Sequence, residues 1–134
     1  MKIVVIDGQG GGVGRGITER LKDLKGTDDQ ITVVGTNAVA TSNMMKAGAG
    51  AGATGENAVC FNCRGADAVV GPVGIILPDA MYGEITPAMA QAVVNSPARK
   101  ILIPVHNHHV HIVGIQPKPL ADYISEACAA VFEQ

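Results

Sequence analysis

Apolar residues along the chain fall into short continuous runs that alternate with helically spaced sets. The β-branched run at residues 2–6 predicts a strand buried on both faces, the run at residues 31–34 a second buried strand, and the runs at residues 68–70 and 101–105 a third and a fourth strand. Between them, apolar positions three and four residues apart predict helices over residues 13–24, 38–47 and 56–64, and a further helix from Pro87 with Thr86 as its N-cap. Residues 48–55, mostly glycine and alanine, are predicted to be a flexible connection.

The C-terminal part breaks this alternation. Residues 110–115 form another apolar run so soon after residues 101–105 that no crossover helix fits between them, and the two runs are predicted to form a hairpin. A last helix is predicted over residues 120–131. This order predicts a single α/β domain over residues 1–134. Its expected architecture is three-layered and Rossmann-like, with a mostly parallel sheet and one antiparallel edge strand.

Composition narrows the classes of partner. Hydrophobic residues make up 47% of the chain and aromatic residues 3%, which suits an aliphatic core between helices and a parallel sheet. The net charge is −2 and the basic residues form no stripe, so nucleic acid and membrane surfaces are not expected partners. We expect a cytoplasmic protein, because no apolar segment resembles a signal peptide or membrane span and the 3 cysteines suggest reduced thiols.

The glycine-rich segment between the first predicted strand and helix indicates a binding function. Backbone N–H groups of such a loop can approach a phosphate closely, and the helix N-terminus adds about half a positive charge. We therefore predict a site for a small phosphorylated ligand, a nucleotide or dinucleotide. The expected binding residues are Asp7, Gly8, Gln9, Gly10, Gly11, Gly12, Val13 and Gly14. A tight connection that binds nothing is the alternative interpretation.

The turns after the second and third predicted strands extend this site. Ligands of open α/β sheets bind at the carboxyl edge of the strands. For that reason Gly35, Thr36 and Asn37, together with Gly71 and Pro72, are expected to line the same crevice. No acid follows the second strand to hold an adenosine ribose, which leaves NADP, a mononucleotide or another phosphorylated ligand as alternatives.

Two carboxylates near this crevice could carry chemistry. Asp7 is expected either to bind a ribose hydroxyl or a metal, or to accept hydrogen bonds from the N–H groups of the loop. A small enzyme, a reductase or a phosphotransferase, that uses Asp7 or Glu84 as acid or base is therefore an alternative function. Whether the protein is an enzyme stays open at this point.

The glycine spacing itself can be compared with known fingerprints. G-x-G-x-x-G fails because Val13 stands at its third glycine, and the P-loop fails because Arg15 replaces its lysine. Gly8, Gly12 and Gly14 match G-x-x-x-G-x-G, and the first ~35 residues thereby resemble the cofactor loop of short-chain dehydrogenases. Neither tyrosine, however, is followed four residues later by the lysine that the Tyr-x-x-x-Lys motif of those enzymes requires.

All 4 histidines lie within residues 106–111. On an extended strand His106 and His108 would share one face and His109 and His111 the other, a spacing that suits Zn²⁺ or Ni²⁺. No Asp, Glu or Cys lies nearby in sequence, so exposed or interface side chains are the other interpretation. A metal-binding or assembly protein is accordingly a third functional class.

Because residues 110–115 are apolar and contain no lysine, we also expect a homo-oligomer formed through this edge.

Cys60 and Cys63 have the spacing of a redox pair but lack the strand-then-helix setting of thioredoxins. Residues three apart share one face of a helix, so we interpret the two as small, buried thiols.

Several short motifs are spread over nearly the whole chain: residues 6–14 (IDGQGGGVG), 35–38 (GTNA), 46–48 (KAG), 52–58 (GATGENA), 71–72 (GP) and 83–87 (GEITP). As a set they resemble a family of short bacterial proteins catalogued as domain of unknown function 3842. The resemblance implies a cytoplasmic, bacterial, single-domain protein. It implies no activity and no catalytic residue.

Overall fold

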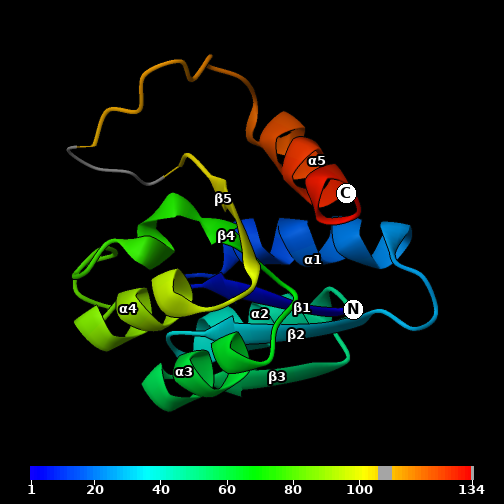
Figure 1. Ribbon diagram of the computed structural model, residues 1–134, viewed down its shortest axis with the longest axis horizontal. Helices are drawn as coiled ribbons and strands as arrows, with labels where there is room; N and C mark the ends of the chain where they lie inside the picture. Colours follow the sequence, from blue (N-terminus) through cyan, green and yellow to red (C-terminus); the bar gives the residue numbers. More distant parts are fainter. Residues whose placement is uncertain (106–109, 134) are drawn as a thin grey trace.

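The computed structural model describes residues 1–105 and 110–133. Its strands form one sheet with the order β3-β2-β1-β4-β5 (Figure 1). The strands are β1 (Lys2–Asp7), β2 (Gln30–Gly35), β3 (Ala51–Thr54), β4 (Ala68–Pro72) and β5 (Arg99–Ile103). The helices are α1 (Gly12–Leu24), α2 (Ala38–Lys46), α3 (Glu56–Arg64), α4 (Pro87–Asn95) and α5 (Leu120–Val131), and a short 3-10 helix, η1 (Val73–Ile76), follows β4.

The sheet has helices on both faces, which confirms the three-layer, Rossmann-like α/β architecture. In β1, Ile3 and Val5 belong to the core cluster that also contains residues of α1, α2 and α5. Val4 and Ile6 point the other way, into the cluster formed with α3 and α4. The uninterrupted apolar run therefore supplies both faces of a strand that is buried on both sides.

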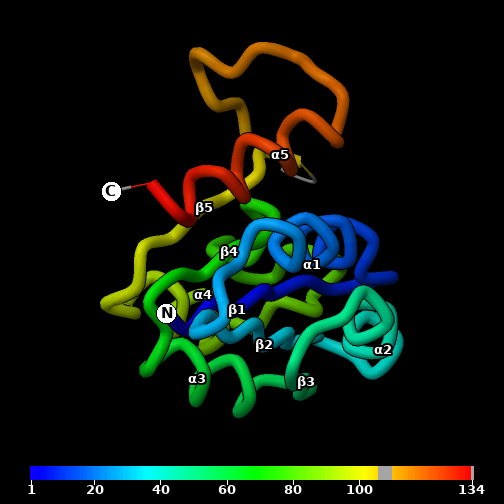
Figure 2. The backbone as a smooth tube through the Cα atoms, turned by 90° about the vertical axis from the view of Figure 1, so that its right-hand side faces the viewer, coloured from blue at the N-terminus to red at the C-terminus, as the bar shows by residue number. Residues whose placement is uncertain are grey.

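The predicted antiparallel edge strand is wrong. Every pair of neighbouring strands in the described residues is parallel, and residues 110–115 form no strand. The chain must pass from β5 to α5, which packs on α1, and Gly114, with φ +90°, turns this segment. Figures 1 and 2 show residues 110–119, in orange, extending away from the sheet toward α5.

β3 is a strand where a flexible connection was expected. Its sequence, AGAT, lacks the β-branched apolar residues that mark the other strands, so the pattern gave no signal. The small side chains have a packing reason, because a Cβ on Gly52 would lie 2.7 Å from Sδ of Met45 in α2. β3 forms through parallel pairing of its backbone with β2, from Thr32 opposite Ala51 to Gly35 opposite Thr54.

The register brings the carboxyl ends of the strands to one edge of the sheet. Asp7 lies opposite Gly35, which in turn lies opposite Thr54. The chain leaves β1 toward β2 and β3 on one side, whereas β4 and β5 lie on the other. The boundary between β1 and β4 is therefore the topological switch point, where open α/β sheets bind ligands.

None of the helices in residues 1–105 and 110–133 combines the length and the apolar character needed to cross a bilayer.

Candidate functional site

A cleft of about 270 Å³ opens at the loop between β1 and α1. It is lined by Asp7, Gly8, Gln9, Gly10, Gly11, Gly12, Val13, Met81 and Leu120. The loop residues come from the switch point of the sheet, whereas Met81 comes from the segment between η1 and α4 and Leu120 from the first turn of α5. Three parts of the chain that are distant in sequence thus form one concave surface.

Asp7 holds the glycine loop in place. Its carboxylate is 4% exposed and accepts hydrogen bonds from the N–H of Gly8 to Oδ1 and from the N–H of Gly14 to Oδ2, each 2.8 Å long. These bonds match one of the roles expected for Asp7, that of an acceptor for the N–H groups of the loop. Both of its oxygens are bonded to the loop, so the charge lies beneath the cleft and stabilises the loop conformation.

Several backbone donors of the loop remain available. The Gly11 N–H bonds to the carbonyl of Gly8 at 2.9 Å, and the Arg15 N–H bonds to the carbonyl of Gly11 at 2.8 Å. The N–H groups of Gly10, Gly12 and Val13 donate to no residue within the part of the chain that the structure describes. Gly12 and Val13 open α1, where the helix dipole adds partial positive charge, so the three donors suit an anion.

The glycines of the loop fall into two sterically different groups. A Cβ on buried Gly8 would lie 2.7 Å from Sδ of Met81, and buried Gly14 packs against Met44. Gly11 has φ +72° and lies against the backbone of Ala40. These glycines are required by packing or by backbone conformation.

Gly10 and Gly12 are different, because both are exposed and a Cβ on either would meet no atom within 4 Å. Neither has a positive φ, so packing and backbone conformation would allow a side chain at both positions. The absence of a side chain leaves the backbone of both residues exposed where they line the cleft.

Glu84 links the glycine loop to the end of β2. Its Oε1 accepts three hydrogen bonds, from the Gln9 N–H at 2.8 Å, from Thr36 Oγ1 at 2.7 Å and from Asn37 Nδ2 at 2.8 Å. Partial burial raises the pKa of this carboxyl, but the hydrogen bonds from Thr36, Gln9 and Asn37 outweigh burial and hold the pKa below its ordinary value. The carboxylate therefore closes the crevice between the loops that follow β1 and β2.

The segment that carries Glu84 has an unusual backbone. Asp79, Met81 and Tyr82 have φ of 67°, 59° and 57°, in the left-handed region that L-residues rarely adopt, and Gly83 follows with φ 89°. Hydrogen bonds of 2.7 Å from the Asp79 N–H to the Ile85 carbonyl and of 3.1 Å from the Ile85 N–H to the Ala80 carbonyl close the segment. Conformations of this kind cost of order 1–3 kcal/mol each and cluster at functional sites. Here they place Met81 in the cleft and leave Tyr82 97% exposed.

The geometry can be compared with known proteins. Residues 2–134 match the family described as Domain of unknown function (DUF3842). The chain belongs to this family. No curated protein matches the sequence. Among solved structures, a dodecameric FMN-dependent Ubix-like decarboxylase from Escherichia coli O157:H7 is similar at 12% identity and a TM-score of 0.47, over 98% of this chain and 91% of the decarboxylase chain.

In this DUF3842 member, the five binding residues predicted at the ends of the second and third strands are not among the residues that line the cleft. The side chains of Thr36 and Asn37 are turned to Glu84, and Asn37 also caps α2 by accepting the Ala40 N–H at 2.9 Å. Gly35 lies against Thr41, and Gly71 against the carbonyl of Ile6. Pro72, also buried, ends β4 beside it. Gly71 thus allows β4 to approach β1 closely at the switch point.

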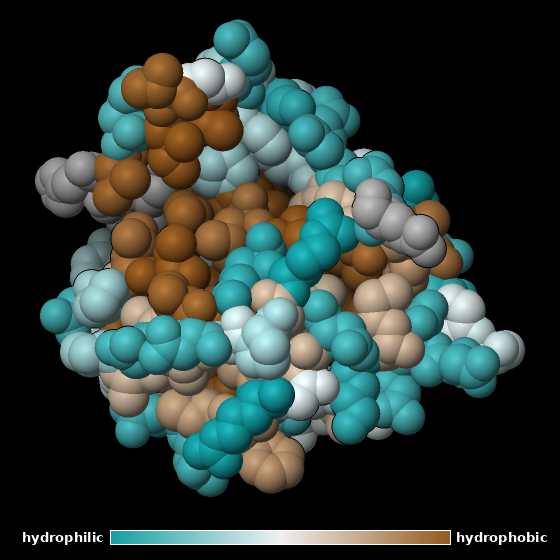
Figure 3. Space-filling view, viewed as in Figure 1, coloured by the Kyte–Doolittle hydropathy of each residue, from teal (hydrophilic) through white to brown (hydrophobic). Residues whose placement is uncertain are grey.

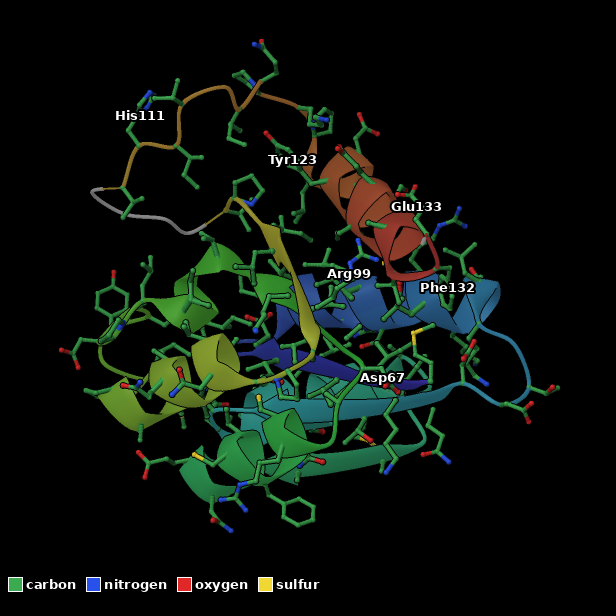
Figure 4. The ribbon with its side chains drawn as sticks, in the orientation of Figure 1. Asp67, Arg99, His111, Tyr123, Phe132 and Glu133 are labelled. Atoms are coloured by element: carbon green, nitrogen blue, oxygen red, sulfur yellow. The ribbon has the colours of Figure 1, made fainter. Side chains whose placement is uncertain are left out.

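The predicted metal site falls mostly outside the described residues, because His106, His108 and His109 lie there. His111 is described and lies on the segment that extends from the body (Figure 4). Within residues 1–105 and 110–133, no three His, Cys, Asp or Glu side chains gather as a metal ion would require. Cys63 is buried and Cys60 is partly buried, and neither is in a disulfide.

Sequence reasoning missed three residues that shape the site. Met81 and Leu120 line the cleft from segments distant in sequence, and Asn43 of α2 donates its Nδ2 to the Gly10 carbonyl at 2.8 Å. No local pattern marks these positions, since each acts only through the tertiary contact with the glycine loop.

Proposed function

We propose that the chain binds a phosphate-bearing ligand, a nucleotide or a related small phosphorylated molecule, at the glycine loop. The observation that carries the proposal is that Gly10, Gly12 and Val13, whose N–H groups bond to no described residue, line one cleft at the start of α1. Packing requires other glycines of this loop, but it does not require Gly10 and Gly12. A ligand that approaches the backbone gives both positions a reason to lack side chains.

The size of the cleft limits how the ligand is held. At about 270 Å³ it lies just below the roughly 300–1,000 Å³ of sites that enclose a whole drug-sized ligand. The phosphate fits inside and the remainder of a nucleotide projects out. Glu84 fills the crevice between the β1 and β2 loops, where the adenosine half of a dinucleotide lies in Rossmann proteins, so NADP would need Glu84 to move.

Charge and hydrogen bonding favour binding over proton transfer. Both oxygens of Asp7 are bonded to the loop, and Glu84 Oε1 accepts three hydrogen bonds. Neither carboxyl is arranged as a general acid, because the oxygens of Asp7 accept N–H groups of the loop and the hydrogen bonds to Glu84 hold the pKa of that carboxyl below its ordinary value. Among the described residues that line the cleft there is no lysine or arginine, so the backbone donors and the helix dipole supply the attraction for the phosphate.

Thermal unfolding with inorganic phosphate, ADP or NADP tests the proposal. A ligand present at ten times its Kd stabilises the folded state by about 1.4 kcal/mol. In a domain of this size that raises Tm by roughly 3–8 °C. Gly12→Val should abolish the shift, because the branched side chain enters the open space beside the N–H groups.

Gly65→Val is the matched control. Gly65 is exposed, a Cβ there meets no atom within 4 Å, and the residue lies at the end of α3, outside the cleft lining. This variant should keep the full shift. No shift for any of the three compounds at millimolar concentration, or an equal shift in Gly12→Val and the unaltered chain, would overturn the proposal.

A further inference from the structure

Residues 110–115, called the arm here, expose apolar side chains. Val113 is 86% exposed, Ile115 44% and Val110 39%. Figure 3 shows hydrophobic surface on the arm and on the body below it, over β5, with a hollow between the two. Isolated apolar residues on a surface are ordinary, but a contiguous patch of this kind marks an interaction site.

The base of the arm is fixed on α5. The Tyr123 hydroxyl donates to the Gln116 carbonyl at 2.6 Å, and Lys118 Nζ lies 2.7 Å from Glu126 Oε2 and 5.1 Å from the centre of the Tyr123 ring. Figure 4 shows Tyr123 near the start of α5, on the side where the chain arrives from the arm, and His111 far from the body. These contacts direct the arm away from its own sheet.

Beside the arm, the outer edge of β5 has no strand next to it in the described chain. A groove of about 340 Å³ runs between this edge, the start of α5 and the residues that end the arm. Its walls are largely apolar: Ile101, Leu102, Ile103 and Pro104 on one side, and Ile115, Tyr123, Ala127 and Ala130 on the other. Arg99 holds the far end of α5 against β5 by donating to the carbonyls of Ala130, at 2.8 Å, and Glu133, at 3.0 Å.

We propose that this groove receives the arm of a second copy of the chain. The lengths are compatible, because residues 110–113, which precede the turn at Gly114, span roughly 13 Å when extended, within the about 17 Å of the five residues of β5. The charges match as well, since the charged residues that line the groove, Lys118 and Glu126, neutralise each other and the arm carries no lysine, arginine or acid.

A second copy is the occupant that the chain itself argues for. Within the described residues, the groove beside β5 and the exposed apolar arm each occur once, so every copy of the chain brings one groove and one arm. Exchange of arms between two copies covers both features at once, and a symmetric pair of such contacts closes the assembly.

Light scattering across a concentration series tests the proposal with Val113→Asp. Val113 makes no core contact that folding needs, so the variant should fold with an unchanged circular dichroism spectrum. The unaltered chain should be a dimer or larger at micromolar concentration, and Val113→Asp should raise the dissociation constant at least ~10-fold. Val39→Asp, at a 63% exposed position of α2, introduces the same charge away from the groove and should leave the assembly intact.

A cross-linking experiment identifies the occupant. A photo-reactive residue replaces Val113 in isotopically heavy chain, which is mixed with light chain before irradiation. A cross-link from the heavy arm to a light peptide that contains residues 101–104 supports the proposal. Three results would each overturn the proposal. The cross-links could form within one chain alone, the chain could remain monomeric at 100 times the lowest concentration that light scattering detects, or the assembly could be unchanged in Val113→Asp.

Discussion

Removal of the Glu84 carboxylate should destabilise the protein in a pH-dependent way. Glu84→Ala leaves Gln9, Thr36 and Asn37 without the acceptor that three hydrogen bonds of 2.7–2.8 Å now share. Hydrogen bonds to charged groups are worth about 1.5–3 kcal/mol each, which gives a gross total of roughly 4–9 kcal/mol. Gln9 is exposed and the other partners are partly exposed, so in the variant water takes over most of these hydrogen bonds. We therefore expect the free energy of unfolding to fall by about 1–2 kcal/mol at pH 7.

The direction of the pH dependence follows from the pKa. The hydrogen bonds hold the pKa of Glu84 in the folded protein below its ordinary value, which the unfolded chain retains. The stabilisation from this group is therefore fully present above the ordinary glutamate pKa and is lost as the pH falls through the folded value. In acid the unaltered protein carries a protonated Glu84, so its stability should approach that of Glu84→Gln.

Urea unfolding of the unaltered chain, Glu84→Gln and Glu84→Ala in steps from pH 7 to pH 3 measures these differences. Glu84→Gln keeps an acceptor oxygen without the charge and should lose less stability than Glu84→Ala at pH 7. The control is Glu19→Gln, which removes an exposed carboxylate paired with the exposed Arg15 and should change stability by less than about 0.5 kcal/mol. A difference between the unaltered chain and Glu84→Gln that stays constant down to pH 3 would refute the assigned role of the charge.

Two further predictions follow from burial. Val13→Ala should cost about 1–3 kcal/mol in urea unfolding, because the valine is 6% exposed in the core cluster under α1; a change below 0.5 kcal/mol, on the order expected for a surface site, would contradict that placement. Burial raises the pKa of the thiols of Cys63 and Cys128 to about 11, so brief treatment of native protein with iodoacetamide at pH 8 should leave both unmodified in peptide mass spectra. Labelling of Cys63 or Cys128 as fast as in urea would show that these thiols are accessible.

The local sequence determined most of the secondary structure. The β-branched run at residues 2–6 predicted a strand buried on both faces, which β1 is from Ile3 onward. The Thr86-Pro87 pair predicted the start of α4, where the Thr86 hydroxyl accepts the Met89 N–H at 3.2 Å. The glycine loop was also visible, because its residues are contiguous and lie between a buried strand and an amphipathic helix. These features depend on periodicity and capping, which act over a few residues.

Tertiary structure decided the features in which distant segments meet. Residues 110–115 have the composition of a strand, yet they lie outside the sheet because Gln116 and Lys118 are bonded to α5. AGAT becomes β3 only because β2 offers a backbone to pair with. The sequence likewise did not distinguish the glycines that packing requires from Gly10 and Gly12. It also did not predict the hydrogen bond between Glu84 and Gln9, which are 75 residues apart. Both features depend on contacts between remote segments, and these contacts exist only once the chain has folded.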